Sequence, residues 1–247
     1  MKFIKANVSI LMVLLLISLC ACSDKNKTPT PTTPTVSGGT NIQLQPTDSD
    51  VTYTYFFVTP LEIPDMSASA SHVDLTCKEV FNICKYIVRG ELVGIKELKT
   101  TKHTESYDRD SYSQVLDFAV KETLGGTELE GNISILYPSS SYNCMEACVN
   151  LLEGNEYIMM LNDTVATSTK VGIEEYAPYS SVYAEYTVIS KSDKGYDAKN
   201  FMTGVLGIDA EDVKQTYTLK EIRDAIEPYE DELKGMTVLE VTKQRKK

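Results

Sequence analysis

Short apolar or alternating runs separated by turn residues begin at residue 51 and predict a mainly β fold. Two glycines, Gly90 and Gly94, fall inside the second run and predict a bulge or a tight bend. Five short strands after the first run, joined by polar connections, predict a small closed barrel or a sandwich. The runs are Val51–Val58, Tyr86–Leu98, Ser111–Glu122, Asn132–Tyr137, Glu156–Asn162 and Tyr183–Lys191.

A capping box predicts a helix ahead of the second run, because Thr76 is followed three residues later by Glu79. The apolar residues of this helix lie on one face, which we expect to point into the domain. They are Cys77, Val80, Phe81 and Cys84.

The pattern becomes helical after residue 192, where Thr218 and Glu221 form a second capping box. Leu219, Ile222, Ile226 and Tyr229 then recur on one helical face. We expect Pro228 to shorten or kink this helix, Gly235 to end it, and Met236–Val241 to add an edge strand.

The N-terminal 21 residues have the features of a secretory signal, with Lys2 and Lys5 ahead of an apolar run from Val8 to Leu19. This run is shorter than the ~20 apolar residues that span a bilayer. It ends in Leu19-Cys20-Ala21-Cys22, which resembles the bacterial lipobox. The resemblance implies that Cys22 receives a diacylglycerol thioether and further acyl chains such as palmitate, and becomes the mature N-terminus. An ordinary signal peptide with a chance cysteine is the alternative.

Residues 22–50 predict a lipid-anchored, Thr/Pro-rich tether. Sixteen of the 28 positions from 23 to 50 are Ser, Thr, Pro or Gly, and four of the chain's nine prolines lie there. Such a stretch buries too little apolar surface to offset its ordering entropy, and we expect it to be an extended spacer.

The charge balance excludes one class of partner. The chain of 247 residues carries 24 basic and 35 acidic residues, a net charge of −11. An acidic surface repels phosphate backbones, so we expect no nucleic acid partner. The lipid alone would hold the protein at a membrane, because an acidic chain gains nothing from anionic headgroups.

The order of elements between about 80 and 165 resembles the OB-type barrel of the netrin/TIMP-like group, which also occurs in uncharacterised bacterial surface proteins. A helix leads into Ile87–Glu91, and a polar hairpin tip follows at Thr100–Asp110. The remaining pieces are Val120–Gly126, Ile133–Leu136 and Leu152–Ile158. The resemblance implies an α+β, mainly β domain at 51–192 with a small OB-like five-stranded barrel, and a helical C-terminal extension at 193–247.

Protease inhibition does not transfer with this resemblance. The eukaryotic inhibitors of the group chelate a metalloprotease zinc through a free N-terminal cysteine. Here the expected mature N-terminus, Cys22, is acylated, and no cysteine opens the domain at Val51.

Four cysteines of the expected mature domain are candidates for disulfides: Cys77, Cys84, Cys144 and Cys148. Cys77 and Cys84 lie ~10.5 Å apart along one helix axis, too far to pair with each other. We therefore expect bridges between the 77/84 helix and the 144/148 segment. A Cys₄ zinc site is an alternative, although Cys77-x₆-Cys84 departs from the usual spacing. Free buried thiols are a third.

Other candidate chemistry is weaker. His103 and the carboxylates around it could form a metal or acid–base centre, but mixed charges are typical of a solvated hairpin tip. Tyr176, Tyr179 and Tyr183 could bind a glycan or a peptide, or pack as strand residues. Nothing in the spacing singles out strand carboxylates such as Glu91 and Asp117 as a catalytic pair.

The sequence therefore predicts an exported lipoprotein that is lipid-anchored to the bacterial cell membrane and faces outside. We expect it to bind an unknown protein or glycan at the cell surface without a cofactor. It holds only two histidines and no nucleophile-elbow, phosphate-loop, dinucleotide or zinc-protease motif, so we expect no enzyme. Inhibition or regulation of extracellular proteases is the alternative, and an envelope hydrolase is less favoured.

Overall fold

The computed structural model describes residues 42–43, 52–59, 74–138, 151–164 and 172–245. All of them belong to one compact unit, Gly39–Lys247. The strands form one nine-stranded sheet in the order β1-β2-β3-β4-β5-β7-β6-β8-β9. Their bounds are β1 Ile42–Gln43, β2 Thr52–Val58, β3 Tyr86–His103, β4 Asp108–Gly126, β5 Gly131–Pro138, β6 Glu156–Asp163, β7 Tyr179–Ser181, β8 Val188–Ser192 and β9 Gly195–Asp197.

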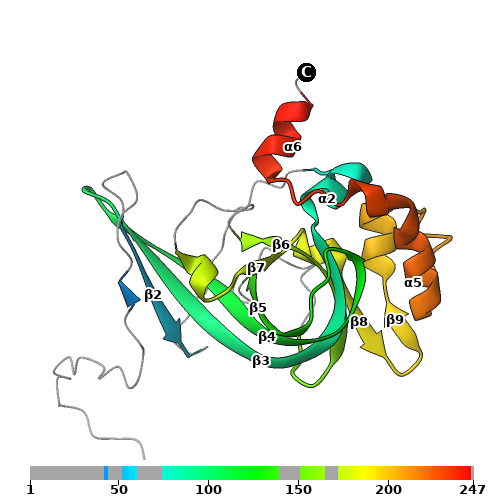
Figure 1. Cartoon of the computed structure of the whole chain (residues 1–247), viewed down its shortest axis with the longest axis horizontal. Coiled ribbons are helices and arrows are strands. Elements are labelled where there is room, and N and C mark those ends of the chain that lie inside the picture. Colours follow the sequence, from blue (N-terminus) through cyan, green and yellow to red (C-terminus); the bar gives the residue numbers. More distant parts are fainter. Residues whose placement is uncertain (1–41, 44–51, 60–73, 139–150, 165–171, 246–247) are drawn as a thin grey trace, which may run out of the picture. The chain divides into compact units, whose positions relative to one another are not determined.

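Five of these strands close into a ring because β3 pairs along both of its edges. Its first residues pair with the end of β4 on one side and, from Tyr86 to Glu91, with β6 on the other. The ring runs from β3 through β4, β5, β7 and β6 and returns to β3. Only the β5–β7 pair is parallel (Figure 1).

The mainly β fold is confirmed, and β3 and β4 are longer than the sequence predicted. They pair over their whole lengths as a hairpin that extends beyond the ring, with β2 alongside its outer half (Figure 1). The expected tip, Thr100–Asp110, is mostly strand, because β3 continues to His103 and β4 begins at Asp108. The turn occupies residues 104–107 alone.

At Gly90 the backbone of β3 lies very close to β4, and the predicted bulge is present there. The register of β3 against β4 shifts at Arg89/Gly90 and again at Leu92/Gly94. A Cβ atom added at Gly90 would lie 2.6 Å from the Phe118 ring and would overlap the Ala119 carbonyl oxygen. A side chain at this position would therefore push β3 and β4 apart.

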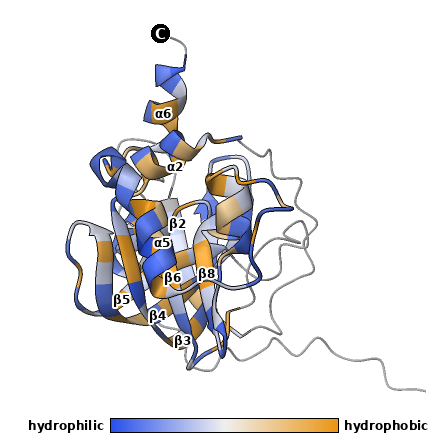
Figure 2. Ribbon diagram, turned by 90° about the vertical axis from the view of Figure 1, so that its right-hand side faces the viewer, coloured by the Kyte–Doolittle hydropathy of each residue, from blue (hydrophilic) through white to orange (hydrophobic). Residues whose placement is uncertain are grey.

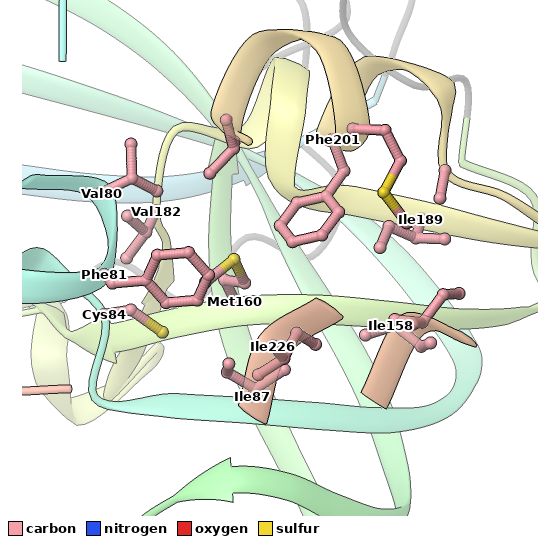
Figure 3. Close-up of a cluster of buried hydrophobic side chains, with 14 of the residues drawn as sticks. Val80, Phe81, Cys84, Ile87, Ile158, Met160, Val182, Ile189, Phe201 and Ile226 are labelled. Carbon is pink, nitrogen blue, oxygen red and sulfur yellow. The ribbon is translucent and has the colours of Figure 1, made fainter. Parts of the chain in front are cut away.

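The strands of the ring separate two of the three buried hydrophobic clusters of the described residues, and apolar and polar residues alternate along the strands (Figure 2). The inner core fills the ring with alternate residues such as Val88, Leu116, Phe118, Ile135 and Met159. The outer core lies on the other face of β3, β6 and β8, where Ile87, Ile158, Met160 and Ile189 pack against helices (Figure 3).

Helices from both ends of the described chain build the outer core. The elements are α2 Cys77–Ile83, the short helix α4 Ala184–Thr187, the π-helix η3 Phe201–Val205, α5 Leu219–Ile226, the 3₁₀ helix η4 Glu227–Glu232 and α6 Val238–Gln244. Both predicted capping boxes are present, at Thr76 and at Thr218. As expected, Val80, Phe81 and Cys84 are buried, whereas Cys77 is half-buried. The helix α5 ends at Ile226, two residues before Pro228, which lies in η4.

Two predicted strands are wrong in part or whole. Residues 183–187 of the run Tyr183–Lys191 form α4 and its N-cap, Tyr183, so β8 begins only at Val188. The expected edge strand Met236–Val241 is instead the start of α6, because Thr237 and Glu240 form a third capping box. This box satisfies the first backbone amides of a helix and favours it over a strand.

The expected tether falls outside the described residues except for Ile42 and Gln43, which pair with Tyr55 and Thr54 of β2. The sheet therefore extends into the range that the sequence assigned to the spacer. Its two outermost strands, β1 and β9, are two and three residues long. Short edge strands limit pairing with other chains.

We expect Gly90→Ala to lower the free energy of unfolding by about 2 kcal/mol or more, as overpacking in a filled site does. Denaturant unfolding of the purified protein measures this change. Gly94→Ala is the matched control in the same strand, because a Cβ atom there would lie 3.4 Å from its nearest neighbour, Asp117 Oδ2, which is ordinary contact. Equal effects of the two substitutions would contradict the role assigned to Gly90.

Candidate functional site

A charged cluster lies on the outer face of the ring, beside the outer core. The face of β6 that carries Ile158 and Met160 into that core also carries Glu156, the first residue of the strand. Arg89 of β3 lies directly opposite Glu122 of β4. The cluster consists of Arg89, Glu91, Lys121, Glu122, Glu156, Lys191, Tyr196 and Arg223.

Glu156 is the centre of this cluster, and its side chain is 9% exposed. Tyr196 donates its hydroxyl proton to Glu156 Oε1 at 2.6 Å. Arg89 Nη1 lies 3.2 Å from the same oxygen and Lys191 Nζ lies 3.3 Å from it. Lys121 Nζ lies 3.3 Å from the other oxygen, Oε2. One carboxylate therefore joins β3, β4, β8 and β9 to β6.

Further ion pairs extend the cluster to α5. Arg89 Nε lies 3.1 Å from Glu122 Oε2, and Arg223 of α5 pairs with the other oxygen of Glu122. Lys121 also lies 3.0 Å from Glu91. The C-terminal helices are thus joined to the ring by charge as well as by the outer core.

The surroundings of Glu156 fix its charge. Burial raises the pKa of a carboxyl group, but here the hydrogen bonds from Tyr196, Lys121 and Lys191 and the charge of Arg89 outweigh burial and lower it to about 2. Burial and the hydrogen bond to Glu156 raise the pKa of Tyr196, so its hydroxyl remains a donor. A carboxylate with this pKa stays ionised near neutral pH, so Glu156 keeps the negative charge that holds its four partners.

An open groove of about 540 Å³ adjoins the cluster at the end of β4. Its lining residues are Lys121, Glu122, Thr123, Leu124, Gly125, Gly126, Glu128 and Glu230. Glu128 lies in the connection between β4 and β5, and Glu230 lies on η4. The groove therefore lies at the end of β4, and its lining includes one carboxylate from the β4–β5 connection and one from η4.

The structure describes two of the four predicted disulfide residues. Cys77 and Cys84 are free thiols, and Cys144 and Cys148 lie outside the described residues, so bridges to them stay a prediction. The Cys84 thiol is buried and donates to the carbonyl oxygens of Tyr86 and Leu161. Burial raises its pKa to about 12, which keeps it protonated. The lipidation candidate Cys22 also lies outside the described residues.

The three tyrosines proposed as a binding site each contact a different aromatic ring. Tyr176 lies 6.4 Å from Tyr55, measured between ring centroids, and Tyr179 lies 5.4 Å from Tyr86. Tyr183 lies 4.7 Å from Tyr186. All three are half-buried, and Tyr179 and Tyr183 pack against the inner and outer cores respectively. These contacts are those of packed side chains.

His103 ends β3 and is held by polar neighbours. Its Nε2 lies 2.9 Å from the Thr54 hydroxyl, and its Nδ1 lies 2.9 Å from Asp108 Oδ1. The two carboxylates considered as a catalytic pair bind different lysines, Glu91 binding Lys121 and Asp117 binding Lys96. In the β3–β4 ladder Glu91 lies opposite Ala119, and Asp117 lies opposite Gly94.

Sequence reasoning missed Glu156, Lys191 and Tyr196. Glu156 opens an apolar strand after a Gly-Asn turn, which gives no motif, and its partners come from four other strands. Only the pairing of strands that lie far apart in the sequence brings these residues into contact.

We expect Glu156→Gln to lower the free energy of unfolding by about 2 kcal/mol or more, because it leaves partly buried cations without their counter-charge. Glu91→Gln is the control, since Glu91 is more exposed and has one ion-pair partner. Denaturant unfolding at neutral pH measures both. A smaller loss for Glu156→Gln than for Glu91→Gln would show that Glu156 is not the centre of the cluster.

Comparison of the wild type with Glu156→Gln at different pH values tests the charge of Glu156. Its pKa in the folded protein, about 2, lies below the ordinary value of 4.5, so its stabilising contribution is complete above about pH 4.5 and is lost as the pH falls toward 2. We expect the stability difference between the wild type and Glu156→Gln to shrink over that window. A difference that stays constant from pH 6 to about 2 would contradict the lowered pKa.

None of the described helices is long and apolar enough to cross a membrane. Within the same residues, no group of three or more His, Cys, Asp or Glu side chains is placed to hold a metal ion. Comparisons with protein-family models, with curated proteins and with solved structures found no match.

Proposed function

We propose that this chain is a lipoprotein of the bacterial cell envelope, anchored through Cys22 and facing outward, whose β domain is a non-catalytic binding module. The N-terminal sequence supports the anchor, since a positive start and a short apolar run precede Leu19-Cys20-Ala21-Cys22. Two or three acyl chains hold a protein at a membrane almost permanently, whereas one does not.

We also propose that the ring is an OB-like barrel. The order β3-β4-β5-β7-β6, the return to β3, and the single parallel pair β5–β7 support this interpretation. The ring departs from a regular barrel because β3 and β4 continue beyond it as a long hairpin. Barrels of this type bind ligands on a rigid frame, and this analogy is one of fold alone.

The observation that carries the binding function is the groove beside β4. It is an open space of about 540 Å³ on a frame held by two cores and by the charged cluster. Sites of this size accommodate small ligands or short peptide segments. The tether would supply reach, because the 20 residues from Cys22 to Asn41, which precede strand β1, span about 60 Å in extended geometry.

Substitution of Cys22 tests the anchor. We expect Cys22→Ala to move the protein from the membrane fraction to the soluble exported fraction, because acyl burial is its only attachment. Cys20→Ala is the matched control and should leave the protein on membranes. Cys20 is a poor acceptor for the lipid, because Leu19 stands where the lipobox has a small residue before its cysteine. Membrane retention of Cys22→Ala at the wild-type level would contradict the proposal.

Photo-crosslinking on intact cells tests the binding function. We expect a photoreactive phenylalanine at position 128 to give a discrete adduct, because that position lines the groove. The control is the same residue at position 193, in the turn between β8 and β9, which should give none. Absence of an adduct at both positions would count against a binding module that uses this groove.

A further inference from the structure

Three side chains at the outer end of the long hairpin form a hydrogen-bonded chain that the proposed function does not use. Thr54 lies on β2, His103 is the last residue of β3, and Asp108 is the first residue of β4 (Figure 1). The Thr54 hydroxyl oxygen lies 2.9 Å from His103 Nε2, and His103 Nδ1 lies 2.9 Å from Asp108 Oδ1. The imidazole ring therefore joins a hydroxyl group to a carboxylate.

Strand pairing brings these three residues to one face of the sheet. His103 lies directly opposite Asp108 in the β3–β4 ladder. Thr54 lies directly opposite Thr101, which precedes His103 by two residues along β3. Because residues two apart in a strand point to the same face, and directly opposed residues share a face, Thr54, His103 and Asp108 meet there.

The carboxylate decides which nitrogen of His103 carries the proton. A carboxylate ion only accepts hydrogen bonds, so in the neutral imidazole Nδ1 holds the proton and donates it to Asp108. Nε2 is then free of a proton and accepts the hydrogen bond of the Thr54 hydroxyl group. In this arrangement imidazole acts as a general base toward a hydroxyl nucleophile, and the carboxylate orients the ring.

The second carboxylate on this face is held by other partners. Thr101 Oγ1 donates to Asp110 Oδ1 at 2.7 Å, and Lys99 Nζ lies 2.8 Å from Asp110 Oδ2. Asp108 is therefore the carboxylate that orients His103. Thr101 donates directly to a carboxylate, whereas Thr54 donates to a ring nitrogen that can accept its proton.

A reactive molecule can approach this chain from solvent. The side chain of His103 is 34% exposed and that of Asp108 is 64% exposed, while Thr54 is half-buried. An open sheet face does not exclude water or hold a leaving group. We therefore expect reaction only with acyl donors whose leaving group departs easily, such as thioesters. The threonine ester that forms has an alkoxide leaving group, so it is less reactive than its donor and persists.

We propose that Thr54 is a self-acylation site, which takes an acyl group from a thioester or another activated ester. The Thr54 oxygen bonds to the acyl carbon while the bond from that carbon to the leaving group breaks. His103 Nε2 takes the hydroxyl proton and passes it to the departing thiolate, so the products are acylated Thr54 and a free thiol. Each chain reacts once, so the step modifies the domain and is not a turnover reaction.

This inference is independent of the proposed binding function. The three residues lie where β4 begins, whereas the groove lies where β4 ends. Failure of either proposal leaves the other standing.

The test uses full-length protein in mild detergent with two donors, p-nitrophenyl acetate and the thioester S-acetyl-N-acetylcysteamine. Intact mass counts the acetyl groups added, and peptide mapping locates them. Hydroxylamine removes acetyl groups from hydroxyl oxygens and leaves those on lysine nitrogens, which separates labelling of Thr54 from background labelling of lysines.

Four variants assign the roles. Thr54→Val removes the hydroxyl group at nearly constant shape, and His103→Gln removes the base. Asp108→Asn places an amide that donates to Nδ1 and so moves the ring proton to Nε2, whereas Asp108→Glu keeps the carboxylate. Thr100→Val is the matched control, because Thr100 is also half-buried but lies on the other face of β3. An unchanged melting temperature confirms that each variant is folded.

We expect Thr54 to gain one hydroxylamine-sensitive acetyl group, which Thr54→Val lacks. His103→Gln and Asp108→Asn should each slow this acetylation by at least about tenfold, and Thr100→Val should change it by less than about twofold. Recovery of the rate in Asp108→Glu would show that Asp108 acts by orienting the ring. Absence of an acetyl group on Thr54 with both donors, or an unchanged rate in His103→Gln, would overturn the inference.

Discussion

The close approach of β3 and β4 at Gly90 is the constraint on which the rest of the fold depends. Because Gly90 has no side chain, the Phe118 ring and the Ala119 carbonyl can lie against its backbone, and β3 can bend enough for its other edge to meet β6. That second pairing closes the ring. Without it the inner face of β3, β4 and β6 would have no enclosed volume in which to bury Val88, Phe118 and Met159.

Ring closure also brings the charged residues together. Arg89 and Glu156 belong to the two strands that meet there, and Lys121 and Glu122 belong to the strand on the other side of Gly90. The C-terminal helices pack directly on the ring, because their apolar residues complete the outer core. Arg223 of α5 also forms an ion pair with Glu122 of β4. The extension and the β domain therefore form one structural unit, and the boundary that the sequence suggested near residue 192 is not a break in packing.

Local signals in the sequence predicted local structure well. The boxes at Thr76 and Thr218 placed two helix starts, and the predicted run Ser111–Glu122 lies within β4. A third box, at Thr237, starts α6 where the sequence analysis expected an edge strand. Tyr183 adopts a left-handed conformation, φ 51°, which the residues beside it in the sequence do not predict. The cluster around Glu156 depends on pairings between strands 30 to 75 residues apart in sequence, which the local pattern of one sequence does not reveal.

The last helix has a consequence for when the domain can fold. Arg245 forms an ion pair with Glu79, the glutamate of the α2 capping box. Met236 donates its backbone amide to the carbonyl oxygen of Asn82 in the same helix. The outer core is thus completed by contacts between residues more than 150 positions apart. Such non-local closure is slow and needs nearly the whole chain. A protein exported in the unfolded state would benefit from this arrangement, since no nascent fragment that lacks the C-terminus can complete the core and block its own passage across the membrane.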